Sequence, residues 1–246
     1  MARTFVSASA NYLQASSTPV TGAPLTMACW FQRASAASFD VFTLNQAGTN
    51  NEGFRLLIST TQMVASARAG SIENQSAIAS VPSTNTWCHY AGVFASSTSR
   101  TVYKDGVAGT TNTGSATPAS LNRVTLGAFV GSTTVNPLNG DAAEFGLWNV
   151  ALTAEDIATL ADGVSPLLVR PDALVGYWPV MGRTSPEVDI IGERHATLSG
   201  TPAQAAHPPM RYPGQVQAWK YAAAGGGGST AVPVFYRHYQ SQRMAA

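Results

Sequence analysis

Acidic residues that lie close together in the sequence are the first candidates for chemistry, because a pair of carboxyl groups can cleave a glycosidic bond. On a strand, two carboxylates share a face when they alternate with other residues, since successive side chains point to opposite faces. Asp141 and Glu144 are separated by three positions, which predicts opposite faces. Glu155 and Asp156 fall in the first turn of a predicted helix, where their negative charges interact favourably with the helix dipole. We therefore expect no catalytic residues and no enzyme activity.

Histidine and glycine patterns give no indication of a cofactor. The histidines lack the spacing of a zinc site; they are His89, His195, His207 and His238. His89 lies in an apolar run and is expected to be a hydrogen-bonded interior or hairpin residue. The glycine run 225–228 is followed by neither Lys-Ser/Thr nor a predicted helix, so it is not a phosphate loop.

Charge and composition exclude several classes of partner. Charged residues make up 11% of the chain and the net charge is +1, whereas about a quarter of an average globular protein is charged. No Lys/Arg cluster is present, so we expect no nucleic-acid partner. A surface with so few charges is poorly protected against association. We expect neighbouring protein chains to cover much of it.

Targeting signals are not apparent in the sequence. The first residues enter a polar strand pattern without an apolar h-region, and no apolar run reaches the roughly 18 residues that a membrane span needs. We expect synthesis in the cytoplasm and no membrane contact. Cys29 and Cys88 should then be reduced and behave as small buried hydrophobes.

A hairpin signature occupies residues 86–106. Residues 86–94 are apolar, β-branched and aromatic, and a polar turn at 96–99 precedes the return strand. Asp105-Gly106 then reverses the chain again, because glycine reaches positive φ without steric cost. The hairpin resembles that of laminin G-like, concanavalin A-like domains at five positions: Trp87, His89, Tyr103, Asp105 and Gly106.

Other segments resemble the same family in the same order. They are the early core strand at 24–31, the Leu-Gly strand at 124–127, the strand before the closing helix at 138–145, and later strands at 174–180 and 197–202. The closing helix is predicted from Thr153 to Ala161, with a variant capping box formed by Thr153 and Asp156 and a stop at Gly163. The resemblance implies an all-β, two-sheet antiparallel jelly-roll sandwich with one short helix and an extended C-terminal arm. We assign residues 1–206 to the sandwich domain and 207–246 to the arm.

The resemblance also bears on metals and disulfides. Relatives often bind calcium through loop carboxylates, and the candidates here are Asp141 and Glu144, with no two acids adjacent near the sheet rims. We expect no metal, with calcium at these residues as the alternative. Pentraxin-like relatives join two of the strands by a disulfide, but Cys29 and Cys88 are displaced in register from that pattern, so free thiols are expected.

Aromatic residues are the remaining route to a ligand, because lectins stack sugars on exposed Trp or Tyr. Four tryptophans lie in strand patterns and are expected in the core; they are Trp30, Trp87, Trp148 and Trp178. Trp219 lies in the arm and is expected to anchor an interface.

The arm ends in an apolar segment. Its start is rich in proline, and the linker 225–230 separates it from the segment 232–239, which we call the docking segment. Strand-forming and aromatic residues suit addition to the edge of another subunit's sheet; a frayed end is the alternative. The expected partner-docking residues are Val232, Val234, Phe235, Tyr236, Tyr239 and Trp219.

Three classes of function are compatible with these features. The first is a non-catalytic virion structural protein of a tailed bacteriophage, either a capsid decoration or a tail-associated component. It is favoured by the low charge, by the docking segment, and by a resemblance of residues 174–179 and 233–239 to phage-encoded laminin G-like proteins. Its partners would be other virion proteins and copies of itself. The alternative is a carbohydrate-binding, lectin-like module that recognises host glycans; an enzyme comes third.

Removal of the docking segment tests its assignment. A chain truncated after Ala224 is expected to fold with nearly unchanged thermal stability but to fail to join its oligomer or particle, because the contacts of residues 232–239 are lost. Thermal unfolding and light scattering of both chains provide the measurement. Equal assembly of the truncated and full chains would show that these residues form a frayed end.

Overall fold

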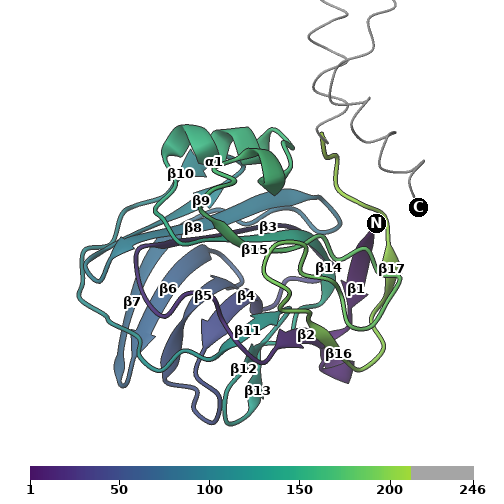
Figure 1. Ribbon diagram of the computed structural model, residues 1–246, viewed down its shortest axis with the longest axis horizontal. Coiled ribbons are helices and arrows are strands. Elements are labelled where there is room, and N and C mark those ends of the chain that lie inside the picture. The colour runs from purple at the N-terminus through teal and green to yellow at the C-terminus, as the bar shows by residue number, and fades with distance from the viewer. Residues whose placement is uncertain (212–246) are drawn as a thin grey trace, which may run out of the picture. The chain divides into compact units, whose positions relative to one another are not determined.

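The computed structural model describes residues 1–211, and all structural statements below concern this part of the chain. Two antiparallel sheets face each other and a short helix lies outside one of them (Figure 1). This arrangement confirms the predicted two-sheet jelly-roll sandwich. Among the described residues, no helix is long and apolar enough to span a membrane.

The first sheet has eight strands within residues 1–211, in the order β10-β9-β8-β3-β14-β1-β17, with β15 also pairing with β14. Its strands are β1 (Ala2–Phe5), β3 (Leu25–Arg33), β8 (Cys88–Ser96), β9 (Ser99–Lys104), β10 (Val107–Ala108), β14 (Gly140–Trp148), β15 (Leu174–Trp178) and β17 (Ala203–Ala205). The first and the last of these strands in the chain, β1 and β17, are neighbours at one end of the sheet.

The second sheet has seven strands in the same part of the chain, in the order β16-β2-β11-β4-β5-β6-β7. Its strands are β2 (Tyr12–Ala15), β4 (Phe39–Asn45), β5 (Glu52–Ile58), β6 (Met63–Ala69), β7 (Ile72–Ile78), β11 (Arg123–Leu126) and β16 (Thr197–Ser199). A separate small hairpin follows β11 and consists of β12 (Phe129–Val130) and β13 (Thr134–Val135).

The main core lies between the sheets, because alternate residues of each strand point inward. In β3 the inward residues include Met27 and Phe31, while the outward ones include Trp30. Rings from opposite sheets meet edge to face: the centroids of Phe54 and Phe94 are 4.8 Å apart. Offset and edge contacts of this kind add stability beyond the burial of apolar area.

A second, smaller core lies on the outer face of the eight-stranded sheet. Helix α1 (Ala154–Ala161) and the short 3-10 helix η2 (Pro166–Leu168) cover it, with Ile157 and Leu160 packed in the same cluster as Trp148. Trp148 Nε1 donates a hydrogen bond to the carbonyl of Val169 at 2.8 Å. The predicted capping box is confirmed, since Thr153 and Asp156 exchange side-chain and backbone hydrogen bonds at the start of α1. A further 3-10 turn, η1 (Ser7–Ser9), connects β1 to β2.

The predicted hairpin is also confirmed. Strands β8 and β9 pair directly, and the turn after β9 has positive φ at both central residues, 48° at Asp105 and 81° at Gly106. Such turns match the twist of the strands that they connect. The carboxylate of Asp105 accepts a hydrogen bond from the backbone N–H of His89 at 2.9 Å, which fixes the turn against β8.

Residues 207–211 form a strap over the outer face of the eight-stranded sheet. His207 lies beside Glu144 of β14, and the backbone of Arg211 is bonded to those of Gly163 and Ser165 just after α1. The start of the predicted arm is therefore held against the sandwich. The predicted docking residues, Trp219 and those in 232–239, lie outside the described residues.

Packing between the sheets can be tested at a glycine. A Cβ added at Gly92 in β8 would lie 2.6 Å from Leu56 Cδ2 and 3.1 Å from Ala65 Cβ, whereas one added at Gly22 would meet nothing within 4 Å. We expect Gly92→Ala to lower the free energy of unfolding by about 1–3 kcal/mol through overpacking. Gly22→Ala should leave it nearly unchanged. Urea unfolding of both variants checks this. Equal stabilities of the two variants would mean that the sheets accommodate the added methyl group at Gly92 without a cost in free energy.

Candidate ligand-binding face

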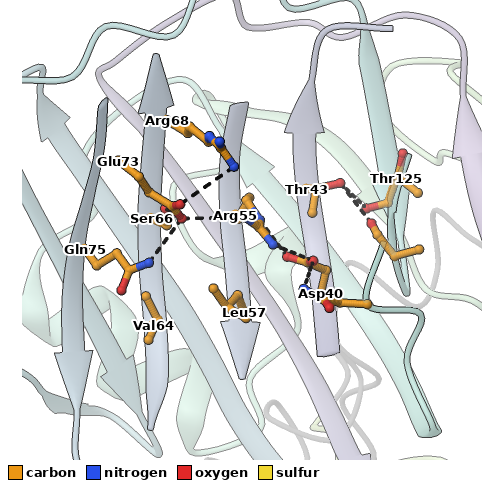
Figure 2. Close-up of polar contacts among 12 residues, drawn as sticks. Asp40, Thr43, Arg55, Leu57, Val64, Ser66, Arg68, Glu73, Gln75 and Thr125 are labelled. Atoms are coloured by element: carbon orange, nitrogen blue, oxygen red, sulfur yellow. Dashed lines mark hydrogen bonds and ion pairs between the residues drawn. The ribbon is translucent and has the colours of Figure 1, made fainter. Parts of the chain in front are cut away.

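Polar side chains cross the outer face of the seven-stranded sheet in register. Strand pairing aligns Gln75, Ser66, Arg55, Thr43 and Thr125 in one row across β7, β6, β5, β4 and β11. Figure 2 shows this row. The row follows from the period of two, because the residues on either side of Arg55 in β5 are part of the main core.

A buried ion pair lies at the centre of the row. Arg55 Nε and Nη2 donate to the two carboxylate oxygens of Asp40 at 2.8 and 2.7 Å, and Asn136 Nδ2 donates to Asp40 at 3.1 Å. The guanidinium carbon lies 5.0 Å from the centroid of the Phe129 ring. Burial raises the pKa of Asp40, and the contacts with Arg55 and Asn136 oppose that rise. Two parallel hydrogen bonds and a ring contact hold the guanidinium in one orientation.

Glu73 continues the network toward the open side. Ser66 Oγ donates to its carboxylate at 2.6 Å and Gln75 Nε2 at 3.1 Å, while the guanidinium groups of Arg55 and Arg68 lie at 3.5 and 4.0 Å. Burial acts to raise the pKa of Glu73, but these hydrogen bonds and cations outweigh it, so the pKa lies below its ordinary value. Glu73 is therefore ionised at neutral pH.

One half of this face is covered and the other is open. The β12–β13 hairpin covers the β4 side, where Thr43 Oγ1 donates to the carbonyl of Ala128 and Asn45 Nδ2 to that of Val130. On the β6–β7 side, the side chains of Arg68 and Glu73 are 30% and 24% exposed. We call the open part, Arg55, Arg68, Glu73 and Gln75, the polar face. It presents fixed donors and acceptors next to one another, and hydroxyl groups can pair with both.

Glu144 lies elsewhere, on the outer face of the eight-stranded sheet, and is buried. Tyr177 Oη donates to its Oε2 at 2.5 Å, and His207 Nε2 lies 3.0 Å from its Oε1. Glu144 has a φ of 60°, and the register of β14 against β3 shifts between Ala143 and Gly146. Left-handed backbone at such a residue costs about 1–3 kcal/mol and persists only where surrounding contacts impose it.

The prediction that Asp141 and Glu144 lie on opposite faces is wrong. The bulge in β14 inserts one residue, so that Ala142 and Phe145 both point into the main core while Glu144 points outward with Asp141. Asp141 accepts hydrogen bonds from Thr4 and Gln32 on the neighbouring strands. Within residues 1–211, no three His, Cys, Asp or Glu side chains are grouped so as to hold a metal ion. The expectation of no metal stays a prediction, and so does its alternative, calcium at Asp141 and Glu144.

The remaining candidate residues are mostly buried. Trp30, Trp148 and Trp178 are buried as expected, and Trp87 is half-buried. His89 is buried against Trp30, with ring centroids 5.5 Å apart. Burial lowers the pKa of His89 from 6.5 to about 3, so its ring is neutral at physiological pH. It is an interior residue, as predicted.

Both cysteines are buried and free, and burial raises the pKa of each thiol. Because the thiolate is the reactive form, neither sulfur is suited to act as a nucleophile. Their burial in the main core confirms the prediction that they behave as small hydrophobes.

The polar face was not predicted from the sequence. A usable signal was present in residues 53–58, where Arg55 stands between Phe54 and Leu56 in an otherwise uncharged, largely apolar run. A charged residue in such a position needs a partner on a neighbouring strand. The partners, Asp40 and Glu73, are 15 and 18 positions away and become visible only once β4, β5, β6 and β7 are aligned.

Comparison with known proteins identifies the superfamily of this fold. The family model of the Concanavalin A-like lectin/glucanases superfamily matches residues 7–158, more than half of the sequence. The chain belongs to this superfamily. No curated protein matches the sequence.

Several solved structures are similar in fold. A candidate carbohydrate binding protein from Bacteroides ovatus shares 16% identity with a TM-score of 0.61, over 85% of this chain and 61% of that one, so this chain spans less than two thirds of its length. The CBM40 of the Ruminococcus gnavus IT-sialidase, bound to alpha2,3 sialyllactose, shares 12% identity with a TM-score of 0.51 over 58% and 83% of the two chains. The heptameric SAP-like pentraxin of Limulus polyphemus shares 16% identity with a TM-score of 0.50 over 61% and 75%. At these identities the likeness shows the fold.

The difference between Glu144 and Asp141 can be measured. Glu144→Ala removes the buried acceptor of Tyr177 and the partner of His207, so we expect a loss of about 3 kcal/mol in the free energy of unfolding. Asp141→Ala leaves a partly exposed site and should cost about 1 kcal/mol. Denaturant unfolding of both variants gives the values. Equal losses would contradict a structural role that is particular to Glu144.

Proposed function

We propose that this chain is a non-catalytic carbohydrate-binding module and that its glycan binds on the polar face. The observation that carries the proposal is the Asp40–Arg55–Glu73 network, which holds charged groups in fixed orientations on the outer face of the seven-stranded sheet. Groups that are already oriented lose little entropy when a ligand binds. Arg68 and Gln75, at the open side, supply donors that reach solvent.

The chemistry of the polar face suits a polyhydroxylated ligand. Each sugar hydroxyl donates one hydrogen bond and accepts others, so neighbouring hydroxyls can pair with a carboxylate on one side and a guanidinium or amide on the other. Asp40 and Glu73 balance the charges of Arg55 and Arg68, so the network as a whole is neutral. This balance favours recognition of hydroxyl patterns over attraction of a strongly charged polymer.

The carboxylates of the network are engaged in ways that favour binding over hydrolysis. Glycoside hydrolysis needs one carboxyl group as acid and another as base or nucleophile. Asp40 is fully buried and paired with Arg55, and Glu73 accepts hydrogen bonds from Ser66 and Gln75. The similarity in fold to the sialyllactose-bound CBM40 and to the candidate carbohydrate binding protein of Bacteroides ovatus supports a binding role.

A second candidate function is assembly into the virion of a tailed bacteriophage, as a capsid decoration or tail-associated component that contacts other virion proteins and copies of itself. The 11% content of charged residues and the aromatic docking segment favour it. The two functions are compatible, because a virion protein can also bind host glycans. Detection of the chain in purified phage particles by mass spectrometry would test the virion location.

Binding at the polar face predicts the behaviour of two variants. The full chain should bind at least one glycan class on an array without cleaving it, and Arg68→Ala and Gln75→Ala should each weaken that binding about tenfold, as expected for the loss of one good hydrogen bond to a charged or amide group. Isothermal titration with the array hit gives the affinities. Thermal unfolding should be unchanged, because both side chains are partly or fully exposed.

Arg170→Ala is the matched control, since Arg170 is an exposed arginine in the connection before β15, where it pairs with Asp156 of α1. It should bind the glycan as the unaltered chain does. Unchanged affinity in Arg68→Ala and Gln75→Ala would place the ligand elsewhere, and release of shorter sugars from the bound glycan would contradict the non-catalytic assignment.

A further inference from the structure

Exposed aliphatic side chains are concentrated in one loop between β15 and β16. Met181, Val188, Ile190 and Ile191 are 46%, 43%, 48% and 41% exposed. They are four of the nine large hydrophobic residues that are exposed within residues 1–211, and they fall within eleven positions. Scattered apolar side chains on a surface are ordinary, but a concentration of this kind indicates an interaction site. We call residues 181–191 the apolar loop.

Buried carboxylates fix the first part of the apolar loop. Glu187 is 3% exposed and accepts hydrogen bonds from Arg3 Nε at 2.5 Å, from the N–H of Met181 at 3.1 Å and from the N–H of Gly182 at 2.9 Å. Its backbone is bonded in both directions to Ala196. The loop is therefore tied to β1 and to the segment that leads into β16.

Asp189 fixes the second part in the same way. It is 2% exposed and accepts hydrogen bonds from the N–H groups of Tyr177, Ile191 and Arg194 at 2.9, 3.1 and 3.2 Å. The N–H of Ile190 donates to the carbonyl of Tyr177 at 2.9 Å. The backbone at Ile190 and Ile191 is thus held in place by hydrogen bonds on both sides. A partner would meet an apolar surface whose backbone is already ordered, which lowers the entropic cost of binding.

Charge is distributed unequally between the sandwich and the end of the chain. Residues 212–246 contain three of the fourteen Lys and Arg residues, namely Lys220, Arg237 and Arg243, and none of the thirteen Asp and Glu residues. They carry +3, and residues 1–211 carry the balancing −2 of the total +1. Glu193, two residues after Ile191, is exposed and forms no ion pair or side-chain hydrogen bond with any described residue. The docking segment places Arg237 directly after Phe235 and Tyr236.

We propose that the apolar loop and Glu193 bind the docking segment, residues 232–239, of a second copy of this chain. Phe235 and Tyr236 would cover Ile190 and Ile191, and Arg237 would pair with Glu193. Exchange between copies is favoured because the strap, residues 207–211, leads the chain from β17 across β14 to Gly163 and Ser165, just after α1. The low charge of the chain also favours self-association. This assembly does not depend on the polar face or on glycan binding.

Variants of the full chain test the proposal from both sides of the contact. Ile190→Ser with Ile191→Ser alters the loop, and Phe235→Ser with Tyr236→Ser alters the docking segment. Sedimentation equilibrium over a range of concentrations should show that the unaltered chain forms oligomers and that each double variant raises the dissociation constant at least tenfold. Thermal unfolding should be unchanged in both, because the substituted loop side chains are exposed. Val107→Ser with Leu168→Ser, at residues that are 66% and 43% exposed outside the loop, is the matched control and should assemble normally.

A charge exchange adds specificity to the test. Glu193→Arg and Arg237→Glu should each weaken assembly, and the chain that carries both changes should recover it, which a general loss of solubility or folding would not produce. The proposal would be overturned if the unaltered chain were monomeric at all concentrations, or if the loop variants assembled normally. It would also be overturned if the docking segment contacted the loop of its own chain. In that case the variants would change protection from proteases without changing the mass of the assembly.

Discussion

Every strand presents side chains to two faces, and each of the four faces of this sandwich must be either covered or polar. The inner faces cover each other and form the main core. The outer face of the eight-stranded sheet is apolar beside Trp148, and α1, η2 and the strap cover it. The outer face of the seven-stranded sheet carries the Arg55 network and the β12–β13 hairpin in place of a layer of helix. The polar face is therefore the part of the seven-stranded sheet that meets solvent through ordered polar groups.

Features set by neighbours in the sequence were predictable. The capping box at Thr153 and Asp156 and the turn at Asp105-Gly106 depend on a few adjacent residues, and both form as expected. Strand order and register depend on residues far apart, and the errors arose there. The alternation rule failed at Glu144, because β14 contains a bulge where it pairs with β3 on one side and β15 on the other. No local sequence pattern predicted this bulge. The polar face was missed for the same reason, since Arg55 finds Asp40 and Glu73 on other strands.

The polar face and the apolar loop differ in which side chains are exposed and which are buried. On the polar face, charged groups are exposed at the open side and held by buried partners, so that specificity comes from the direction of hydrogen bonds. In the loop, the charged groups Glu187 and Asp189 are buried and the apolar side chains are exposed, so that specificity comes from shape. A protein that binds a ligand through one and a copy of itself through the other would bring several ligand sites together in one assembly.

The pairing of β1 with β17 has a consequence for the order in which the chain folds. Arg3 is opposite Gln204, and Arg3 also contacts Glu187 and the carbonyls of Thr184 and Pro202. During synthesis, the first strand emerges long before these partners exist and cannot complete its edge of the sheet until nearly the whole domain has left the ribosome. Strands β3 to β9 meet partners that are mostly closer in sequence and can pair earlier. Strand β1 thus completes its pairing late, and folding of the domain is complete only after translation has passed residue 205.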